Sequence, residues 1–458
     1  MKILVVIPPY VLGEGNEAVL PNKAMLPVGP LVVAGQLRKR GHEVEVLDLV
    51  FEEEWWQALP QTVPDAVLLS CHTVRNVPVC AAVLGELTKV WSRRPHTVLG
   101  GNIAFDIGIA DFARLGLEVD AVVRGFAHDV DVLEAIEKRL TADIHPDKKH
   151  LTGDLPVPAL DLLSPTVHAC YLVASGGRYP LYGLGLGCRW DCAYCSSKGN
   201  LPWTPRSTPT SVAEQISLAK QLGYSEIWAV DNLLFTDLAA TLEFDFLVAA
   251  NGMTWSGMTR AELVCELPED FLGQLNSLHE VALGVESVTF SVLKILHRGR
   301  VRGYCVTITT AVFRLKAVGI VVNLFVILGL PGMTEEDFSA LWKFIEVLHP
   351  STISWSFYNP PVRVVAEGKV LPADTGFYRW PFSGLSAVPS ERVVQWAMLL
   401  SGRWWCGWTP KSDPYWEEGK EFGVDFLEYL LLQEKSARSP VGDLWEIWKE
   451  RRNHAQSA

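Results

Sequence analysis

Residues 181–195 read LYGLGLGCRWDCAYC, and the interpretation of the whole chain starts from this stretch. Its cysteines, Cys188, Cys192 and Cys195, follow one another at intervals of four and three residues on a loop rich in glycine. Cysteines on one such loop can converge on a single inorganic centre, and iron–sulfur clusters are held by such thiolates. Because three cysteines leave one iron of a four-iron cubane without a protein thiolate, the stretch predicts a [4Fe-4S] cluster with an open coordination position, typical of catalytic sites. Two other interpretations stay open: a zinc site with a fourth ligand such as a histidine, and a chance grouping of cysteines.

The composition is that of a folded, acidic protein. The 458 residues include 40 Lys+Arg and 52 Asp+Glu, so the formal net charge is −12, and 49% are hydrophobic. A chain of this length is expected to form two or three domains. An acidic surface without a basic block argues against nucleic acid as a partner and weakly favours cationic small ligands. No apolar run suits a membrane span or the core of a signal peptide, so we expect a cytoplasmic protein without a membrane partner.

The other six cysteines are scattered along the chain, which is not the pattern of a disulfide framework. We interpret each of them as a small buried hydrophobic residue. They are Cys71, Cys80, Cys170, Cys265, Cys305 and Cys406.

The first 140 residues alternate short apolar runs with helical segments, which predicts a parallel sheet with helices on both faces. Five runs indicate a flavodoxin-like, doubly wound domain over residues 1–140. A helix is expected over Val28–Lys39, because Gly41 follows its last turn. In such sheets, ligands bind at the carboxyl ends of the strands. The predicted strands are Ile3–Ile7, Glu43–Leu47, Ala66–Ser70, Thr97–Gly100 and Ala121–Val123.

A second alternation of strands and helices follows a polar, proline-bearing segment, residues 141–178, which we interpret as a linker. Six strand–helix units over residues 179–360 are too few for a closed eight-stranded barrel, so they predict an open (β/α)6 partial TIM barrel. Helices are expected over Pro209–Leu222 and Glu335–Leu348. A small C-terminal region, residues 361–458, is rich in tryptophan and ends in a charged helix. The predicted barrel strands are Tyr182–Gly187, Glu226–Val230, Thr254–Gly257, Val281–Val285, Val321–Leu328 and Thr352–Phe357.

On these features the chain resembles the radical S-adenosylmethionine superfamily, whose signature CxxxCxxC lies on the loop after the first barrel strand. The resemblance covers roughly residues 181–360. It implies that Cys188, Cys192 and Cys195 bind a [4Fe-4S] cluster and that the open iron binds S-adenosylmethionine. An injected electron then cleaves S-adenosylmethionine to methionine and a 5′-deoxyadenosyl radical, which abstracts hydrogen from an unactivated carbon.

The same resemblance assigns cofactor-binding roles to residues near the ends of later strands. Tyr194 takes the aromatic position that packs near the adenine. Asp231 and Asn232 end the second strand, where the superfamily often meets the methionine amino group. Glu286 ends the fourth strand like the ribose-facing segment, and Gly329 lies in the fifth-strand segment beside the adenine.

For the two carboxylates, other interpretations stay open. Asp231 also fits the cap of the next element. Glu286 also fits a structural carboxylate that is paired with Arg260.

The N-terminal domain resembles the cobalamin-binding-like domain that precedes the barrel in a large branch of this superfamily. Two departures from that branch are visible. Residues 126–129 read FAHD where the branch commonly has Glu-Gly-Glu, and no D-x-H-x-x-G motif supplies a lower-face histidine. The sequence therefore leaves cobalamin binding open, with His72 or Arg75 as candidates to face that ligand. The matching stretches are Val5–Pro9, Gly29–Leu31, Ala66–Ser70, Leu99–Gly101 and Val122–Gly125.

Three functions fit these features. We favour radical 1,2-diol dehydration of an aminoglycoside in antibiotic biosynthesis, as in the lyases that deoxygenate paromamine at the 3′ position in the apramycin pathway, which the chain resembles. The short C-terminal region, the departures in the cobalamin-binding-like domain and the acidic balance favour this interpretation. Asp231, Glu262 and Glu286 are then the candidates for the general base and for the grip on ammonium groups. The alternative is a cobalamin-dependent radical C-methyltransferase. A third function, a binding module with a redox-sensing cluster, fits the complete strand pattern less well.

Each enzymatic interpretation implies the same kinds of partner. The substrate is a small polar natural product, polycationic in the case of an aminoglycoside. The electron comes from a donor of the flavodoxin or ferredoxin type. The dehydratase interpretation adds a reductase that acts on the product.

Overall fold

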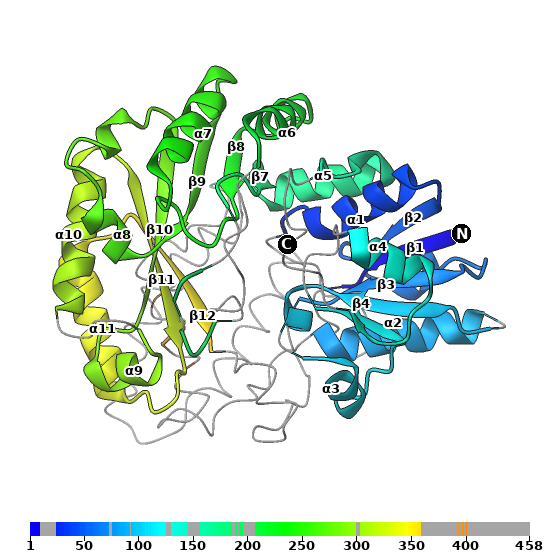
Figure 1. The fold of residues 1–458 in the computed structure, drawn as a ribbon. Helices are drawn as coiled ribbons and strands as arrows, with labels where there is room; N and C mark the ends of the chain where they lie inside the picture. Colours follow the sequence, from blue (N-terminus) through cyan, green and yellow to red (C-terminus); the bar gives the residue numbers. More distant parts are fainter. Residues whose placement is uncertain are drawn as a thin grey trace, which may run out of the picture.

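The computed structural model describes residues 1–9, 24–72, 76–91, 93–105, 107–124, 130–144, 156–185, 188–190, 192–195, 207–298 and 303–358, together with 393, 396, 397 and 400. The predicted C-terminal helix, Leu444–Arg452, and most of the Trp-rich region lie outside these residues. Within the described part, two six-stranded parallel sheets form the two halves of the chain (Figure 1). This confirms the predicted fold class, a flavodoxin-like sheet followed by an open partial barrel. None of the described helices is long and apolar enough to cross a membrane.

The first sheet has the strand order β2-β1-β3-β4-β5-β6, in which the first five strands follow the flavodoxin-like order. All five predicted strands are present. The sixth strand, β6, was not predicted, because two residues are too few to show a pattern. The strands are β1 (Lys2–Ile7), β2 (Glu43–Asp48), β3 (Ala66–Ser70), β4 (His96–Gly100), β5 (Ala121–Val123) and β6 (Asp143–Ile144). The helices are α1 (Val28–Lys39), α2 (Asn76–Val90), α3 (Ile109–Arg114) and α4 (Val130–Glu137), with 3-10 turns η1 (Trp55–Ala58) and η2 (Asn102–Phe105).

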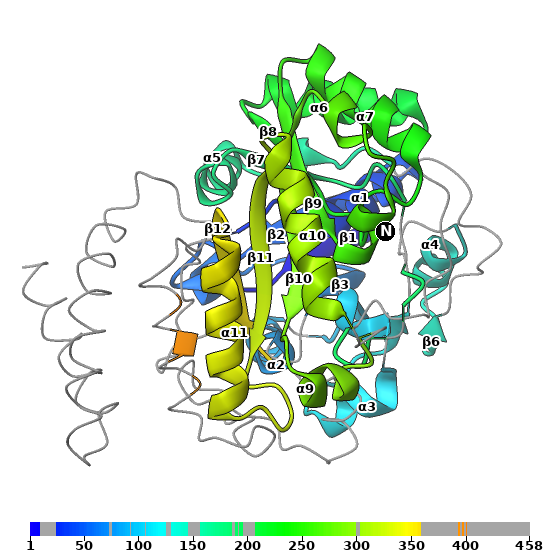
Figure 2. The same cartoon turned by 90° about the vertical axis from the view of Figure 1, so that its left-hand side faces the viewer.

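The second sheet runs in sequence order from β7 at one edge to β12 at the other, with every neighbouring pair parallel. Its strands are β7 (Arg178–Leu181), β8 (Glu226–Ala229), β9 (Thr254–Thr259), β10 (Leu278–Glu286), β11 (Val321–Leu328) and β12 (Thr352–Phe357). Its helices are α6 (Pro209–Gln221), α7 (Leu238–Ala250), α8 (Ala261–Glu266), α9 (Phe290–Ile295), α10 (Tyr304–Ala317) and α11 (Glu335–Leu348), with a 3-10 turn η4 (Leu272–Gln274). Figure 2 shows α10 and α11 lying along one face of this sheet, over β10 and β11.

Side-chain caps fix where the barrel helices begin. The hydroxyl of Thr208 accepts a hydrogen bond from the backbone amide of Ser211, and Pro209 occupies the first turn of α6, where its missing N–H costs nothing. At the start of α11, Thr334 and Asp337 form a reciprocal capping box. These local signals explain why both predicted helices are present, the second with the predicted boundaries.

The first barrel strand lies earlier in the chain than predicted. We predicted it over Tyr182–Gly187, but β7 ends at Leu181. The amides of Gly183, Leu184 and Gly185 bond to a buried side chain on another segment, so they are not available to a neighbouring strand. Gly185 also has a φ of +132°, which a strand residue does not adopt. The apolar, glycine-rich stretch is therefore a loop.

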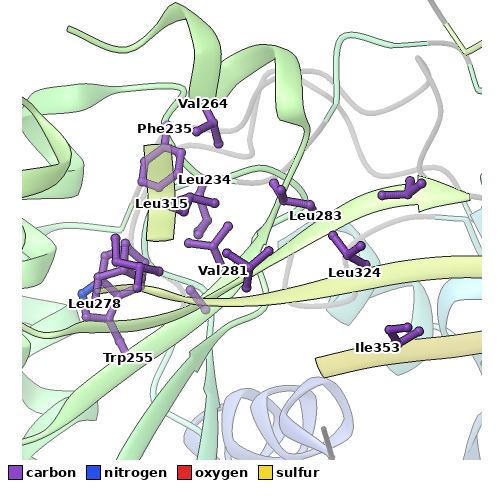
Figure 3. Close-up of a cluster of buried hydrophobic side chains, with 14 of the residues drawn as sticks. Leu234, Phe235, Trp255, Val264, Leu278, Val281, Leu283, Leu315, Leu324 and Ile353 are labelled. Carbon is purple, nitrogen blue, oxygen red and sulfur yellow. The ribbon is translucent and has the colours of Figure 1, made fainter. Parts of the chain in front are cut away.

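The barrel core lies between the sheet and its helices. Figure 3 shows Leu283 on β10, Leu324 on β11 and Ile353 on β12 as part of one cluster of buried side chains. Trp255 on β9 is fully buried in this cluster, packs edge-on against Phe244 at 5.1 Å between ring centroids, and is covered by α7. Each such side chain contributes about 1.5–3 kcal/mol through burial of apolar surface. This core holds the strand ends, and with them the loops, in fixed positions.

Paired polar side chains occupy the amino-terminal ends of the barrel strands. Arg178 on β7 donates to Glu226 on β8 at 3.2 Å and to Glu280 on β10 at 3.0 Å. Asn323 on β11 donates to Glu280 at 3.0 Å and to Ser354 on β12 at 3.1 Å. Because β7 and β10 are not neighbours in the sheet, these bonds cross its concave side. One end of the barrel is thus filled by structural ion pairs, which leaves the opposite, carboxyl end for ligands.

The segment predicted as a linker contains a helix, α5 (Pro165–Ala174), after a 3-10 turn, η3 (Leu160–Leu162). Tyr171 on α5 is fully buried and donates a 2.7 Å hydrogen bond to Oδ2 of Asp48, the last residue of β2. The ring of Phe51 packs edge-on against Tyr171 at 4.8 Å. One apolar cluster includes Leu31 of α1, Tyr171, and Leu181 of β7. Helix α5 therefore packs against both halves, as its position in Figure 1 also shows.

Candidate functional site

Asp231 positions the loop that leads to the cysteines. It follows β8, is fully buried, and accepts hydrogen bonds from the amides of Gly183 (3.1 Å), Leu184 (2.9 Å) and Gly185 (2.7 Å). Burial raises the pKa of this carboxyl to about 6, and the three amide donors act in the opposite direction. Both carboxylate oxygens of Asp231 are used in these bonds: Oδ2 accepts from Gly183, and Oδ1 accepts from Leu184 and Gly185. Its neighbour Asn232, which we also predicted to bind S-adenosylmethionine, is half-buried beside it.

The three cysteines lie on one loop between β7 and α6. Cys192 is buried, and Cys188 and Cys195 are half-buried. The amide of Ala193 donates to the carbonyl of Leu296, the residue that follows α9, at 3.0 Å. A turn closes between the amide of Cys195 and the carbonyl of Cys192 at 3.1 Å. The loop is thus attached to the barrel on two sides, by Asp231 and by the end of α9.

Two buried arginines contact the sulfur of Cys192. Nη1 of Arg260 lies 3.3 Å from Sγ, and Nη1 of Arg298 lies 4.0 Å from it. Both side chains are only 3% exposed. The sequence suggested Arg260 only as a partner of Glu286, and nothing in it pointed to Arg298. The position of Arg260, directly after β9 at the carboxyl edge of the sheet, could have identified it as a site residue. Arg298 follows α9 in a stretch without a motif, so its sequence position gives no such indication.

Glu286 joins the cysteine loop to the barrel. Its Oε1 accepts a 2.9 Å hydrogen bond from the hydroxyl of Tyr194 and lies 3.6 Å from Nη2 of Arg298. The alternative considered for Glu286, a structural carboxylate paired with Arg260, holds with a different arginine, because Arg260 forms a 2.6 Å pair with Glu262 two residues further along the chain. Burial raises the pKa of Glu286, while Arg298, Tyr194 and the charge of Arg260 lower it. Burial and the nearby Glu286 carboxylate raise the pKa of Tyr194.

The backbone at the end of β10 is shaped for this contact. Glu286 has a φ of +59°, an uncommon value for a residue with a side chain, and the register with β11 shifts between Gly284 and Glu286. A Cβ at Gly284 would lie 2.7 Å from Oε1 of Glu286 and 2.9 Å from Nη2 of Arg298. Strain of this kind persists where the surroundings hold it, and it is common at functional sites.

Gly329, the fifth-strand residue predicted to flank the adenine, directly follows β11. Its φ is +72°, and a Cβ there would lie 3.1 Å from Cγ1 of Val393. Trp396 is fully buried, stacks on Phe338 of α11 with 4.7 Å between ring centroids, and donates to Glu335 at 3.1 Å. The described residues of the C-terminal region thus pack beside the end of β11.

The donor set at the carboxyl edge fits a cluster. Among the residues that the structure describes, no three His, Cys, Asp or Glu side chains meet closely enough to share a single metal ion. A [4Fe-4S] cubane makes a different demand, because each cysteine binds a different iron atom. Three thiols on one anchored loop, with two guanidinium groups against Cys192, suit an anionic cluster.

The carboxyl edge of the first sheet holds a second set of candidate residues. Ser70 at the end of β3 pairs with Gly100 of β4, so both strands end at the same level. The next residues include His72, which is exposed and whose Nε2 lies 3.2 Å from the Ser70 hydroxyl. A Cβ at Gly101 would clash with the carbonyl oxygen of Cys71, so only glycine fits there. Arg75 and residues 126–129 lie outside the described part.

Comparisons with known proteins identify similar sequences and similar structures. Residues 22–134 match the sequence profile of the family described as B12 binding domain. The hopanoid C-3 methylase of Methylococcus capsulatus is 28% identical over 283 residues, which cover 57% of this chain and 53% of the relative. The threonylcarbamoyladenosine tRNA methylthiotransferase of Mus musculus is 28% identical over 327 residues, which cover 68% of this chain and 54% of the relative. The chain thus spans about half the length of these curated relatives.

Solved structures share the two-sheet architecture. The radical S-adenosylmethionine methyltransferase TsrM from Kitasatospora setae, with a tryptophan substrate and an S-adenosylmethionine analogue bound, has a TM-score of 0.59 at 17% identity. The match covers 80% of this chain and 76% of that chain. A second structure of TsrM, with cobalamin and a [4Fe-4S] cluster bound, has a TM-score of 0.58 at 16% identity and covers 80% and 78%. The likeness extends over both halves of the fold.

Proposed function

We propose that this chain is a cobalamin-dependent radical S-adenosylmethionine enzyme that transfers a methyl group to a carbon atom of a small polar substrate. One observation carries the proposal: a domain matching the B12 binding family precedes a partial barrel with three cysteines at its carboxyl edge. The hopanoid methylase and the methyltransferase TsrM, by their names, support methyl transfer over the dehydration that the sequence favoured.

The cofactor set follows from the two halves. The cluster supplies a low-potential electron and an open iron for S-adenosylmethionine, and cobalamin supplies a carrier for the methyl group. Cys188, Cys192 and Cys195 would bind the cluster. The carboxyl edge of β3 and β4, with His72 and the tight backbone at Gly101, would face cobalamin.

The dehydratase interpretation named Asp231, Glu262 and Glu286 as candidates for the general base and for the grip on ammonium groups. Asp231 accepts three backbone amides, Glu286 is engaged by Tyr194 and Arg298, and Glu262 is paired with Arg260. Each of the three carboxylates therefore already has partners within the protein. Asp231 instead orients the cysteine loop, and Glu286 holds the aromatic ring that follows it.

The predicted partners belong to the proposal. The net charge of −12 and the absence of a basic block favour a small molecule over nucleic acid, although one relative is named for tRNA. A flavodoxin- or ferredoxin-type protein in the cytoplasm would supply the electron.

Anaerobic reconstitution tests the proposal. The full chain is loaded with iron, sulfide and hydroxocobalamin and desalted, and iron, sulfide and cobalamin per chain are measured. We expect about four irons and about one cobalamin, and formation of methylcobalamin after reduction in the presence of S-adenosylmethionine. Four irons without cobalamin would exclude methyl transfer by this route and restore the dehydratase interpretation. Little iron in the wild type, with the same result in Cys192→Ala, would overturn the assignment of the cysteine loop.

A further inference from the structure

The sulfur of Cys192 lies in a positively charged, buried environment. Two guanidinium groups contact its sulfur, at 3.3 Å from Arg260 and 4.0 Å from Arg298. Both come from outside the cysteine loop, 68 and 106 residues along the chain. A thiolate in contact with two buried cations is stabilised much more than one that is exposed to water.

Each arginine is held in place by other partners. Arg260 is paired with Glu262 and stacks on the ring of Trp190, with its guanidinium carbon 4.5 Å from the ring centroid. Arg298 donates to the hydroxyl of Tyr304 at 3.0 Å and to the carbonyl of Gly284. Side chains with this many fixed contacts do not swing away to follow a ligand. Their charges are therefore permanent features of the site.

We propose that Arg260 and Arg298 are positioning residues that raise the reduction potential of the cluster bound through Cys192. The inference rests on the proposed function, since it requires the cluster. Reduction of [4Fe-4S]2+ to [4Fe-4S]+ adds one electron, supplied by a low-potential donor protein or by dithionite, and no bond breaks. A fixed cation in a poorly polarisable surrounding favours the form with the extra negative charge, and hydrogen bonds to a ligand sulfur act in the same direction.

Glu262 gives the proposal a second, opposite test. It binds Arg260 through two hydrogen bonds, at 2.6 Å to Nη2 and 3.3 Å to Nε, and so offsets part of its charge. The pKa of Glu262 is lowered by Arg260, against the opposing effect of burial. If the charge of Arg260 raises the reduction potential of the cluster, removal of the Arg260 charge will lower that potential. Removal of the Glu262 charge will then raise it.

The experiment is a redox titration of the reconstituted full chain, followed by electron paramagnetic resonance in the absence of S-adenosylmethionine. The variants are Arg260→Gln, Arg260→Lys, Arg298→Gln and Glu262→Gln. The matched control is Arg314→Gln, because Arg314 is also a barrel arginine but donates only to backbone carbonyls near the end of α8 in the contacts described, at 2.8–3.1 Å. Iron per chain is measured in every sample.

We expect Arg260→Gln to lower the ratio of reduced to oxidised cluster at a fixed potential at least tenfold, a shift of about 59 mV for a one-electron couple. Arg298→Gln should shift the potential less, because its contact is longer, and Glu262→Gln should shift it to more positive values. The potentials of Arg260→Lys and Arg314→Gln should remain near that of the wild type.

Wild-type potentials in Arg260→Gln and Arg298→Gln with four irons bound would overturn the inference. If the arginine variants lose iron, Glu262→Gln decides, and an unchanged or more negative potential there overturns it as well. Loss of iron from the wild type would instead contradict the proposed function.

Discussion

The hydroxyl of Tyr194 donates a 2.9 Å hydrogen bond to Oε1 of Glu286, and this bond joins the cysteine loop to the end of β10. Its acceptor is buried, carries the strained φ of +59°, and faces Arg298. The ring that the family resemblance assigned to an adenine has a structural role, because its hydroxyl holds the loop between Cys192 and Cys195 against the barrel.

Tyr194→Phe should loosen this attachment. Loss of a buried hydrogen bond to a charged acceptor costs about 1.5–3 kcal/mol, so we expect a lower thermal midpoint and less iron retained after desalting. Tyr224→Phe is the matched control, because the Tyr224 hydroxyl is buried without a hydrogen-bond partner among the described residues. Equal midpoints and iron contents in both variants would contradict the structural role of Tyr194.

Asp231→Asn separates positioning from catalysis. Asn has one acceptor oxygen in place of the two that bind the amides of residues 183–185, so we expect a loss of about 2–4 kcal/mol and a reduced iron content. Asp237→Asn is the control, because Asp237 is an exposed aspartate that caps α7 through the amide of Ala240 at 3.0 Å. Full iron and wild-type stability, with cleavage of S-adenosylmethionine abolished, would instead support direct contact of Asp231 with that molecule.

The carboxyl of Asp48 makes stability depend on pH. Burial raises its pKa to about 6 in the folded protein, whereas the pKa of an aspartate in the unfolded chain is about 3.9. Its contribution to stability is therefore complete below about pH 4 and is lost as the pH rises through 6, by about 3 kcal/mol. Thermal midpoints measured from pH 4.5 to 7 should fall more steeply in the wild type than in Asp48→Asn.

Asp65→Asn controls this measurement. The backbone amide of Lys2 lowers the pKa of Asp65, so this carboxyl is ionised in both states over the same window. The difference in midpoint between Asp65→Asn and the wild type should therefore stay nearly constant with pH. A constant difference for Asp48→Asn as well would show that Asp48 does not titrate in this range.

Trp396 should stabilise the barrel although it lies far along the chain. It is fully buried and stacks on Phe338, so Trp396→Ala should cost about 3–5 kcal/mol. Trp396→Phe keeps the stack but loses the bond to Glu335, and a cost of about 1 kcal/mol is expected. Thermal midpoints of the two variants check this order. Equal decreases in Trp396→Ala and Trp396→Phe would indicate that the stack on Phe338 contributes little.

Local sequence patterns predicted the parts of the structure that local interactions determine. The cysteine spacing, the apolar strands and the capped helices α6 and α11 all involve residues within a few positions of one another. The first barrel strand was misplaced because the alternation of glycine and leucine resembles a strand. The amide bonds to Asp231, more than 40 residues away, and the positive φ of Gly185 show that this stretch is a loop.

Contacts between segments that lie far apart in the chain could not be predicted from the sequence. Nothing in the order of residues indicates that Arg298 reaches Cys192 across 106 positions, or that Glu286 pairs with Arg298 and not with Arg260. Glu286 has a positive φ at the point where the register of β10 with β11 shifts, and neither feature shows in the local sequence. Such pairings follow from the folded geometry.

The apolar contacts that run from α1 through α5 to β7 make the two halves interdependent. Because Tyr171 and Leu31 belong to the same cluster as Leu181, heat should unfold both sheets in one cooperative transition. A barrel expressed without the first domain would expose the face of α5 that carries Tyr171, and self-association is the expected result. The contacts through α5 thus couple the stability of one sheet to that of the other.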